Sequence, residues 1–215
     1  MFENAEYLLF DLDGTLTDSA PGILSSVRYS LQKMKRPIPD GAVLGKFLGP
    51  PLLSSYAEHC GMTKSEALCA LELYREYFTD RGMFENSLYD GITDALTKLK
   101  NSGKKLVIAT SKPEPFARTI AEHFKISGYF DAIVGATMDE KRTAKKDVVG
   151  YILETLNIPE SKAVMIGDRK GDIDGGHACG VKAIGVLYGY GDRDELKDAD
   201  ALAGSPEELC GLFLK

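Results

Sequence analysis

The chain of 215 residues is predicted to be an α/β protein, a doubly wound parallel sheet with an inserted helical domain. Three observations predict this class. Short apolar runs alternate with helical patterns from Tyr89 to the C-terminal end. A further apolar run, Tyr7 to Phe10, stands alone near the start, and no convincing strand pattern interrupts residues 21–81. Right-handed crossover helices between parallel strands would cover both faces of the sheet.

The first apolar run leads directly into a pair of carboxylates. Tyr7 to Phe10 are apolar on both faces, as in a strand covered on both sides, and Asp11 and Asp13 follow. Gly14 then allows a sharp turn. Two like charges beside a buried strand are costly, and a divalent cation is the simplest compensation. Oxygen ligands without a His or Cys cluster favour Mg²⁺ over zinc, whereas an Asp-rich turn without a ligand is the plainer alternative.

The inserted region is predicted to be helical. Apolar residues at spacings of three and four indicate a first helix over about residues 23–34. Thr63, with Glu66 three residues later, has the capping-box pattern that begins a longer helix. The expected division is a sheet domain of residues 1–16 and 84–215, with a helical domain of residues 17–83 between them.

Four more buried strands are expected after this region. The apolar runs that predict them are residues 106–109, 132–134, 163–166 and 183–186. Helical patterns before, between and after them cover about residues 92–99, 115–124, 145–156 and 206–213. Ligands in open sheets of this type bind beyond the carboxyl ends of the strands, so the residues after each strand are the site candidates.

Polar residues of specific kinds follow two of these strands. Thr110 and Ser111 come after the second, and Asp168 comes after the fourth, with Asp172 one helical turn on. The Thr110 hydroxyl could hold a phosphoryl oxygen, and it could equally cap the next helix. Asp172 could be favoured at a helix start by the helix dipole alone. The residues themselves leave these alternatives open.

The run FDLDGTLTDS, residues 10–19, resembles the first motif of the haloacid dehalogenase-like (HAD) phosphohydrolases. IATSK resembles the second motif of that family, and GDRKGD has the GDxxxD spacing of the fourth. The resemblance covers nearly the whole chain and implies a Rossmannoid HAD core with a helical cap. It points to the phosphoglycolate phosphatase-like subgroup.

The resemblance also implies roles for individual residues. Asp11 would attack phosphorus, Asp13 would act as general acid and base, and Thr110 would contact the phosphate. Mg²⁺ would be bound by Asp11, Asp168 and the backbone carbonyl of Asp13, with Asp172 in support.

The third motif of the family supplies a lysine before an apolar helix. The run EKRTAKKDVVGYIL resembles it, and aligning VVGYIL with the family pattern places the functional lysine at Lys145. Lys146 is the alternative, because a slip of one residue is easy. The resemblance implies that this lysine pairs with Asp11 and the transferring phosphoryl group. Without the resemblance, such a charged run is usually a solvated loop.

Further substrate contacts are expected from both domains. They are Gly14 and Ser111 in the core, and Gly49 and Lys46 in the cap. FLGPPLLSSY, residues 47–56, resembles a cap segment that faces the active site in relatives, where a basic residue is expected soon afterwards. Ser54 and Ser55 stand there instead, and Lys46 is only a weak substitute. Lys112 could also support the phosphate contact of Thr110, although a surface role is the stronger expectation for it.

These residues predict a Mg²⁺-dependent phosphomonoester hydrolase that acts on a small phosphorylated metabolite through an aspartyl-phosphate intermediate. The substrate would be of the phosphoglycolate phosphatase-like or nucleotidase-like kind. A sugar phosphomutase, a pyrophosphatase, a phosphonate hydrolase and a non-catalytic phospholigand-binding module are the alternatives. A phosphonate hydrolase would need a Schiff-base lysine from the cap, and none can be identified. A dehalogenase is disfavoured because Asp13 is present.

Composition narrows the partners and the compartment. The net charge of -6 argues against nucleic acid or an anionic membrane as the main partner. No apolar run approaches the roughly 20 residues of a membrane span, and the N-terminus does not resemble a secretory signal. The four cysteines are scattered, so we expect reduced and mostly buried thiols in a cytoplasmic protein. We expect a monomer or a small homo-oligomer.

Overall fold

The computed structural model describes residues 2, 4–139 and 141–214, and the chain divides into two compact units. The core unit comprises Met1–Thr17 and Leu88–Lys215, and the helical unit is Asp18–Ser87. The predicted boundaries after residues 16 and 83, and the role of the inserted residues in specificity, remain predictions. Within the described residues, none of the helices combines the length and the apolar character needed to cross a membrane.

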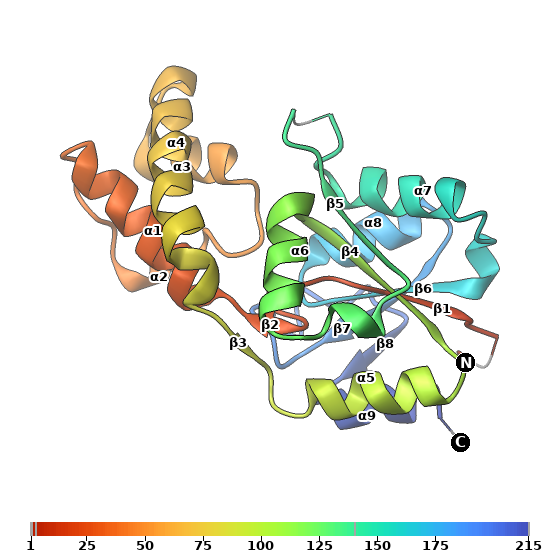
Figure 1. Ribbon diagram of the computed structural model, residues 1–215. Coiled ribbons are helices and arrows are strands. Elements are labelled where there is room, and N and C mark those ends of the chain that lie inside the picture. Colours follow the sequence, from red (N-terminus) through yellow and green to blue (C-terminus); the bar gives the residue numbers. More distant parts are fainter. Residues whose placement is uncertain (1, 3, 140, 215) are drawn as a thin grey trace. The chain divides into compact units, whose positions relative to one another are not determined.

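The core unit contains a six-stranded sheet whose paired strands are all parallel (Figure 1). The strands lie in the order β5 (Ala132–Ala136), β4 (Lys105–Pro113), β1 (Tyr7–Phe10), β6 (Ala163–Gly167), β7 (Lys182–Val186) and β8 (Ala201–Ala203). The five predicted strands are all present. The short Ala-Leu-Ala strand β8 was not predicted, because three weakly apolar residues give no strand pattern.

Helices cover both faces of this sheet, which confirms the doubly wound α/β prediction. On one face, α7 (Lys145–Thr155) packs against α8 (Lys170–Ala178). On the other face, α5 (Ile92–Asn101) packs against α9 (Pro206–Gly211) (Figure 1). Helix α6 (Glu114–His123) packs on β4 and β5. The short 3-10 turns η2 (Ser127–Tyr129) and η3 (Glu160–Lys162) precede β5 and β6.

The central strand explains its own sequence. Leu8, Leu9 and Phe10 are 0%, 0% and 1% exposed, because each face of β1 meets a layer of helices. Leu9 belongs to a core cluster with residues of α7 and α8, whereas the Phe10 ring meets the Phe130 ring edge-on at 6.2 Å. A strand buried on both faces therefore reads as an unbroken apolar run.

The helical unit consists of α1 (Ala20–Lys33), α2 (Gly41–Gly45), α3 (Leu52–Cys60), α4 (Lys64–Asp80) and the turn η1 (Gly82–Phe84). The predicted capping box begins α4. The Glu66 backbone N–H donates to the Thr63 hydroxyl at 3.3 Å, and the Thr63 backbone N–H donates to the Glu66 carboxylate at 2.9 Å. The chain passes between the units through β2 (Thr17–Asp18) and β3 (Ser87–Leu88), which pair with each other.

The four cysteines are all free thiols, as expected for reduced residues. The prediction that most of them are buried is wrong. Only Cys210 is buried, Cys69 is exposed, and Cys60 and Cys179 are intermediate. Cys69 lies on the solvent side of α4, where a single small apolar side chain is commonly tolerated.

Candidate active site

Strand β1 positions Asp11 and the turn that follows it. The Asp11 backbone N–H continues the sheet by donating to the Ile166 carbonyl at 2.9 Å. Gly14 has a φ of 80°, a left-handed conformation that favours glycine. A Cβ at Gly14 would lie 2.2 Å from an Asp168 carboxylate oxygen, so no other residue fits this turn without displacement. The turn thus brings the first motif directly against Asp168.

Three carboxylates meet beyond the carboxyl ends of β1 and β6. Asp11, Asp168 and Asp172 are all buried, and each offers an oxygen that lies within 4.8 Å of the others. Asp11 and Asp168 follow neighbouring parallel strands, while Asp172 lies in the first turn of α8. The Arg169 backbone N–H donates to the Asp172 carboxylate at 3.0 Å. The sheet geometry therefore gathers carboxylates from both ends of the sequence into one cluster.

Lys145 reaches this cluster from the first residue of α7. Its ammonium lies 2.9 Å from Asp11 Oδ1 and 2.7 Å from Asp172 Oδ1, and it donates to the Ala109 carbonyl at 2.9 Å. The Lys145 side chain is only 5% exposed. The neighbouring Lys146 is exposed. Of the two candidate lysines, Lys145 is therefore the one that contacts the carboxylates.

The electrostatics of the cluster leave negative charge uncompensated. Burial, followed by the charges of Asp172 and Asp11, raises the pKa of Asp168 to about 8. The donors that oppose this shift are neutral: the Thr15 hydroxyl at 3.1 Å and the Tyr190 backbone N–H at 2.9 Å.

The charges of the other two carboxylates are coupled to Lys145. Burial raises the pKa of Asp11, although Lys145 acts in the opposite direction. Burial lowers the pKa of Lys145, but Asp11 and Asp172 outweigh it and the net shift is upward. One ammonium therefore serves two carboxylates, and within residues 2, 4–139 and 141–214 no cationic side chain pairs with Asp168. Buried oxygen donors with excess negative charge fit a hard divalent cation such as Mg²⁺. Asp11, Asp168 and Asp172 are the side chains that could hold it.

Lys112 forms a second ion pair in the same region. Its ammonium lies 2.8 Å and 2.6 Å from the two carboxylate oxygens of Asp13. The Lys112 side chain is 6% exposed and that of Asp13 is 17% exposed. The surface role expected for Lys112 is wrong, because β4 does not end at Ala109. The strand continues to Pro113 after a register shift, so Lys112 is in the sheet and not in an exposed loop.

Thr110 and Ser111 directly precede Lys112 in β4. Thr110 is 1% exposed, and its hydroxyl hydrogen-bonds the Asp11 carboxylate and accepts from the Lys112 backbone N–H at 3.2 Å. Helix α6 begins after Pro113 without a side-chain cap, so Thr110 is not its N-cap. Ser111 is half-buried near the end of β4. The phosphate-contact roles of both remain predictions.

A loop after the last predicted strand supports Asp168, and it was not predicted. The Tyr190 backbone N–H donates to Asp168 Oδ2 at 2.9 Å. A Cβ at Gly189 would lie 2.2 Å from the Gly14 carbonyl oxygen and 2.4 Å from Asp168 Cβ. These contacts use backbone atoms, and the only hint in the sequence is the glycine-rich run YGYG after the last predicted strand.

Two predicted substrate residues belong to the helical unit. Lys46 is the exposed C-cap residue of α2, and Gly49 is exposed with a φ of 101°. Ser55 is buried, and its hydroxyl donates to the Pro51 carbonyl at 3.3 Å, whereas Ser54 is exposed. The substrate roles of Lys46 and Gly49 remain predictions. So does the Mg²⁺ contact of the Asp13 carbonyl.

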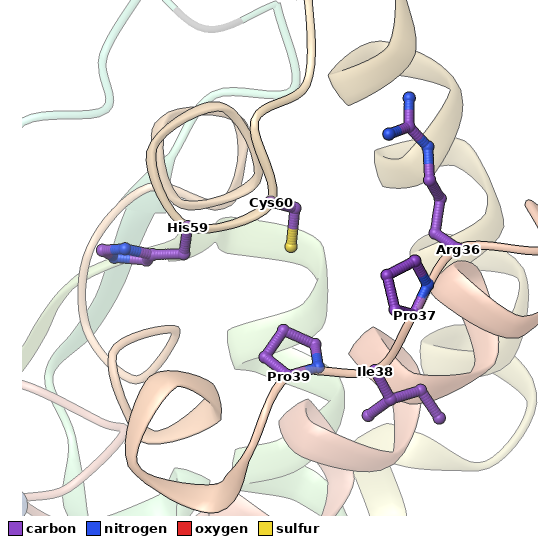
Figure 2. Close-up of a pocket in the computed structure, with 6 residues that line it drawn as sticks. All are labelled: Arg36, Pro37, Ile38, Pro39, His59 and Cys60. Carbon is purple, nitrogen blue, oxygen red and sulfur yellow. The ribbon is translucent and has the colours of Figure 1, made fainter.

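The helical unit also has a hollow of about 300 Å³ between α3 and the segment after α1. It is lined by Arg36, Pro37, Ile38, Pro39, His59 and Cys60 (Figure 2). The Arg36 guanidinium and the His59 ring point away from the Cys60 thiol and from each other. Arg36 is already paired with Glu66. These polar groups do not converge on one ligand, and none of the predicted site residues lines the hollow.

Comparison with known proteins places these features in a family. The model of the haloacid dehalogenase-like hydrolases matches residues 8–186. A 5'-nucleotidase of Pseudomonas aeruginosa is 43% identical over 203 residues, covering 94% of this chain and 90% of its own. The tyrosine-protein kinase PtkA of Mycobacterium tuberculosis is 42% identical over 193 residues, covering 89% of this chain and 65% of its own. The chain thus spans about two thirds of that relative.

A more distant curated relative and a solved structure are also similar to this chain. Phosphoglycolate phosphatase 1 of Pseudomonas aeruginosa is 29% identical over 193 residues, covering 85% of this chain and 70% of its own. The crystal structure of a predicted phosphatase from Clostridium acetobutylicum matches with a TM-score of 0.93 and 48% identity, covering 97% of each chain. The matched segment includes Asp11, Asp13, Lys145 and the GDRKGD run, in the order expected from the resemblance. The chain belongs to the haloacid dehalogenase-like hydrolases.

Proposed function

We propose that this protein is a Mg²⁺-dependent phosphomonoester hydrolase that acts on a small phosphorylated metabolite through an aspartyl-phosphate on Asp11. One observation carries the proposal. The Asp11 carboxylate is held by Lys145 at 2.9 Å, within an oxygen cluster that also includes Asp168 and Asp172. Both named phosphatase relatives and the matched crystal structure support this reaction type.

Asp11 would act as the nucleophile. One of its oxygens forms a bond to phosphorus while the bond from phosphorus to the leaving oxygen breaks. Lys145 holds the carboxylate in place and offsets negative charge on the transferring phosphoryl group. The Thr110 hydroxyl contacts Asp11 and could also donate to a phosphoryl oxygen. A metal bound by Asp11, Asp168 and Asp172 would supply positive charge to neutralise and orient the phosphate.

Asp13 would move the protons in both steps. In the first step it gives a proton to the leaving oxygen, which departs as an alcohol and leaves Asp13 as a carboxylate. In the second step Asp13 takes a proton from water while the water oxygen attacks phosphorus. The bond between phosphorus and Asp11 then breaks, inorganic phosphate leaves, and Asp13 carries the proton again. The sum is one ester and one water converted to one alcohol and one phosphate.

The helical unit would supply substrate selectivity. Lys46 and Gly49 are the proposed contacts, and a nucleoside monophosphate and phosphoglycolate represent the two substrate kinds that the relatives suggest. Lys46→Ala should raise the KM for the preferred substrate with little change in kcat, if Lys46 binds the part that does not react. The same substitution should leave hydrolysis of 4-nitrophenyl phosphate nearly unchanged. A cytoplasmic location and the oligomeric state remain predictions.

The decisive experiment measures phosphate release from 4-nitrophenyl phosphate and from a panel of phosphorylated metabolites, with and without Mg²⁺. Wild-type protein should release phosphate only when Mg²⁺ is present, and Asp11→Asn should lose at least about 10³-fold in kcat, as expected when a covalent nucleophile is removed. Asp174→Asn is the matched control, because Asp174 is an exposed acid in the same motif region and pairs with the exposed Lys170. Full activity in Asp11→Asn would overturn the mechanism.

Three other outcomes would redirect the proposal. Transfer of phosphate between positions of a sugar would indicate a phosphomutase, and preference for inorganic pyrophosphate would indicate a pyrophosphatase. The PtkA relatives raise phosphoryl transfer from ATP to a tyrosine, which a tyrosine-containing peptide and labelled ATP would reveal. Folded protein that binds phosphate esters without turnover would indicate a binding module.

A further inference from the structure

We infer that Lys112 is a positioning residue for Asp13, one that directs the Asp13 carboxyl group at the leaving oxygen of the substrate. This inference rests on the proposed function, because it assigns a partner to the proposed general acid and base. Its basis is a close ion pair between two residues that lie 99 positions apart in the sequence.

The contact geometry is more restrictive than an ordinary surface pair. A single ammonium lies within 2.8 Å of both oxygens of Asp13, and the Lys112 side chain is 6% exposed. Surface ion pairs contribute little to stability, whereas a lysine removed from water must be compensated by its partner. The fold thus places a costly buried cation on Asp13, whereas the Lys145 ammonium pairs with Asp11 and Asp172.

The two lysines pair with different carboxylates of the site. Lys145 contacts Asp11 and Asp172, the nucleophile and a member of the acidic cluster. Lys112 contacts Asp13, the proposed proton carrier. Asp11 and Asp13 are two residues apart in the sequence, and with a single lysine nearby their carboxylates would compete for it. Separate partners let each carboxylate keep its own orientation.

The backbone fixes where the Lys112 ammonium sits. Lys112 lies in the last part of β4, and its backbone N–H donates to the Thr110 hydroxyl at 3.2 Å. The same hydroxyl contacts Asp11. The register shift between Ala109 and Pro113 therefore turns Lys112 toward the first motif and links it to the nucleophile through Thr110.

This arrangement has a chemical consequence for the first step. When Asp13 gives its proton to the leaving oxygen, it becomes a carboxylate, and the Lys112 ammonium is already in place to stabilise that charge. A poor leaving group depends on this proton, whereas a good one departs without it. Loss of Lys112 should therefore slow hydrolysis most for esters of weakly acidic alcohols.

The test compares 4-nitrophenyl phosphate with benzyl phosphate, which has a similar shape but a far less acidic leaving group. In Lys112→Met, kcat/KM for benzyl phosphate should fall about 100-fold, the lower range of general acid catalysis, and that for 4-nitrophenyl phosphate less than about 10-fold. The ratio of the two losses does not depend on how much of the variant is folded. Lys112→Arg, which keeps the charge, should recover part of the benzyl phosphate activity. Lys98→Met, at an exposed lysine of α5, is the control.

A second variant separates positioning from substrate binding. In the Asp13→Asn background, Lys112→Met should cause no further loss in the burst rate of 4-nitrophenol, because its partner is already removed. Equal losses for both substrates, or a further loss in that background, would overturn the inference. An Asp11→Asn variant that keeps the activity of the wild-type protein would instead count against the proposed function.

Discussion

The two units of this protein bury different kinds of polar group. Among its described residues, the core unit buries five charged side chains, namely Asp11, Lys112, Lys145, Asp168 and Asp172. The helical unit, all of whose residues are described, buries no charged side chain; its buried polar groups are hydroxyls and the side-chain amide of Asn86. Its charged pair between Arg36 and Glu66 has side chains that are 37% and 36% exposed.

This difference separates chemistry from scaffolding. Buried charges cost several kcal/mol each unless they are compensated, so a fold that gathers five of them spends stability at that place. In the helical unit, polar groups instead cap helices or form hydrogen bonds within the packed interior. Ser30, for example, shares a hydrogen bond of 2.6 Å with the Tyr56 hydroxyl inside its core. The comparison predicts that equivalent substitutions in the two units will have very different effects.

The largest effect is expected at Lys145. Lys145→Met leaves Asp11 and Asp172 buried without their cation, and breaking such a pair from one side costs about 3–5 kcal/mol. Activity should fall by about 10³-fold or more, because the same ammonium holds the nucleophile. Urea unfolding and phosphate release would measure the two effects.

The matched control for Lys145 is Arg36→Met in the helical unit. It breaks a half-exposed pair and should cost less than about 1 kcal/mol, with kcat unchanged. Equal destabilisation by the two substitutions would contradict the distinction between the units.

Without bound metal, the excess negative charge near Asp168 should make the stability of the protein depend on pH. The pKa of Asp168 is about 8 in the protein without a metal, against a usual value of 3.8. Between these values the folded protein holds a proton that the unfolded chain has lost. The stability of the metal-free protein should therefore decline as pH rises from about 4 to about 8.

Metal binding should have the opposite pH dependence. Mg²⁺ competes with the proton on Asp168, so its apparent affinity should rise up to about tenfold per pH unit between pH 6 and pH 8. Isothermal titration calorimetry in buffers of different ionisation enthalpy would count the released proton. The Asp174→Asn variant should behave like wild type. Mg²⁺ affinity that does not vary with pH would contradict the coupling.

A smaller effect is expected at the loop that backs Asp168. In Gly189→Ala the new Cβ would lie 2.2 Å from the Gly14 carbonyl, so the loop or the first-motif turn must move. We expect Mg²⁺ affinity and kcat/KM to fall by about 10-fold to 100-fold, in the range seen when the outer contacts of a metal ligand are lost. Calorimetry and steady-state kinetics would measure them.

The control for that loop lies in α8. A Cβ at Gly171 would meet nothing within 4 Å, although Gly171 directly precedes Asp172. Gly171→Ala should therefore keep Mg²⁺ affinity and raise stability by up to about 1 kcal/mol through helix propensity. A loss of affinity in this variant equal to that in Gly189→Ala would show that crowding of Asp168 is not the cause.

Residues that directly follow a strand were easier to predict from the sequence than residues whose contacts depend on strand register or on backbone atoms. Asp11 and Asp168 were predictable because parallel strands deliver their carboxyl ends to one edge of a sheet, whereas Asp172, in α8, was expected from the GDxxxD spacing of the family resemblance. Lys112 was misjudged because a lysine after a predicted strand is usually solvated, and the register shift that keeps it inside β4 has no sequence signature. The Tyr190 contact was missed because a backbone N–H makes it.

The fold itself was largely predictable, and the exceptions have a common cause. Five strands were predicted from apolar runs, whereas β8 is a three-residue strand at the sheet edge with little apolar content. The helical unit was recognised by its helical periodicity and the Thr63 capping box. Its substrate contacts remain predictions, because Lys46 and Gly49 show no feature that separates them from other exposed residues.

The smallest effect is expected where the helical unit is most regular. Thr63→Ala removes the hydroxyl that accepts from the Glu66 backbone N–H, and loss of such a cap costs about 1 kcal/mol. Because no buried charge is disturbed, kcat for 4-nitrophenyl phosphate should stay within about twofold of wild type while the midpoint of urea unfolding falls. Thr63→Ser, which keeps the capping oxygen, should restore the midpoint. A large loss of kcat in Thr63→Ala with a normal midpoint would mean that the helical unit takes part in the chemical step, and the division between the two units would have to be redrawn.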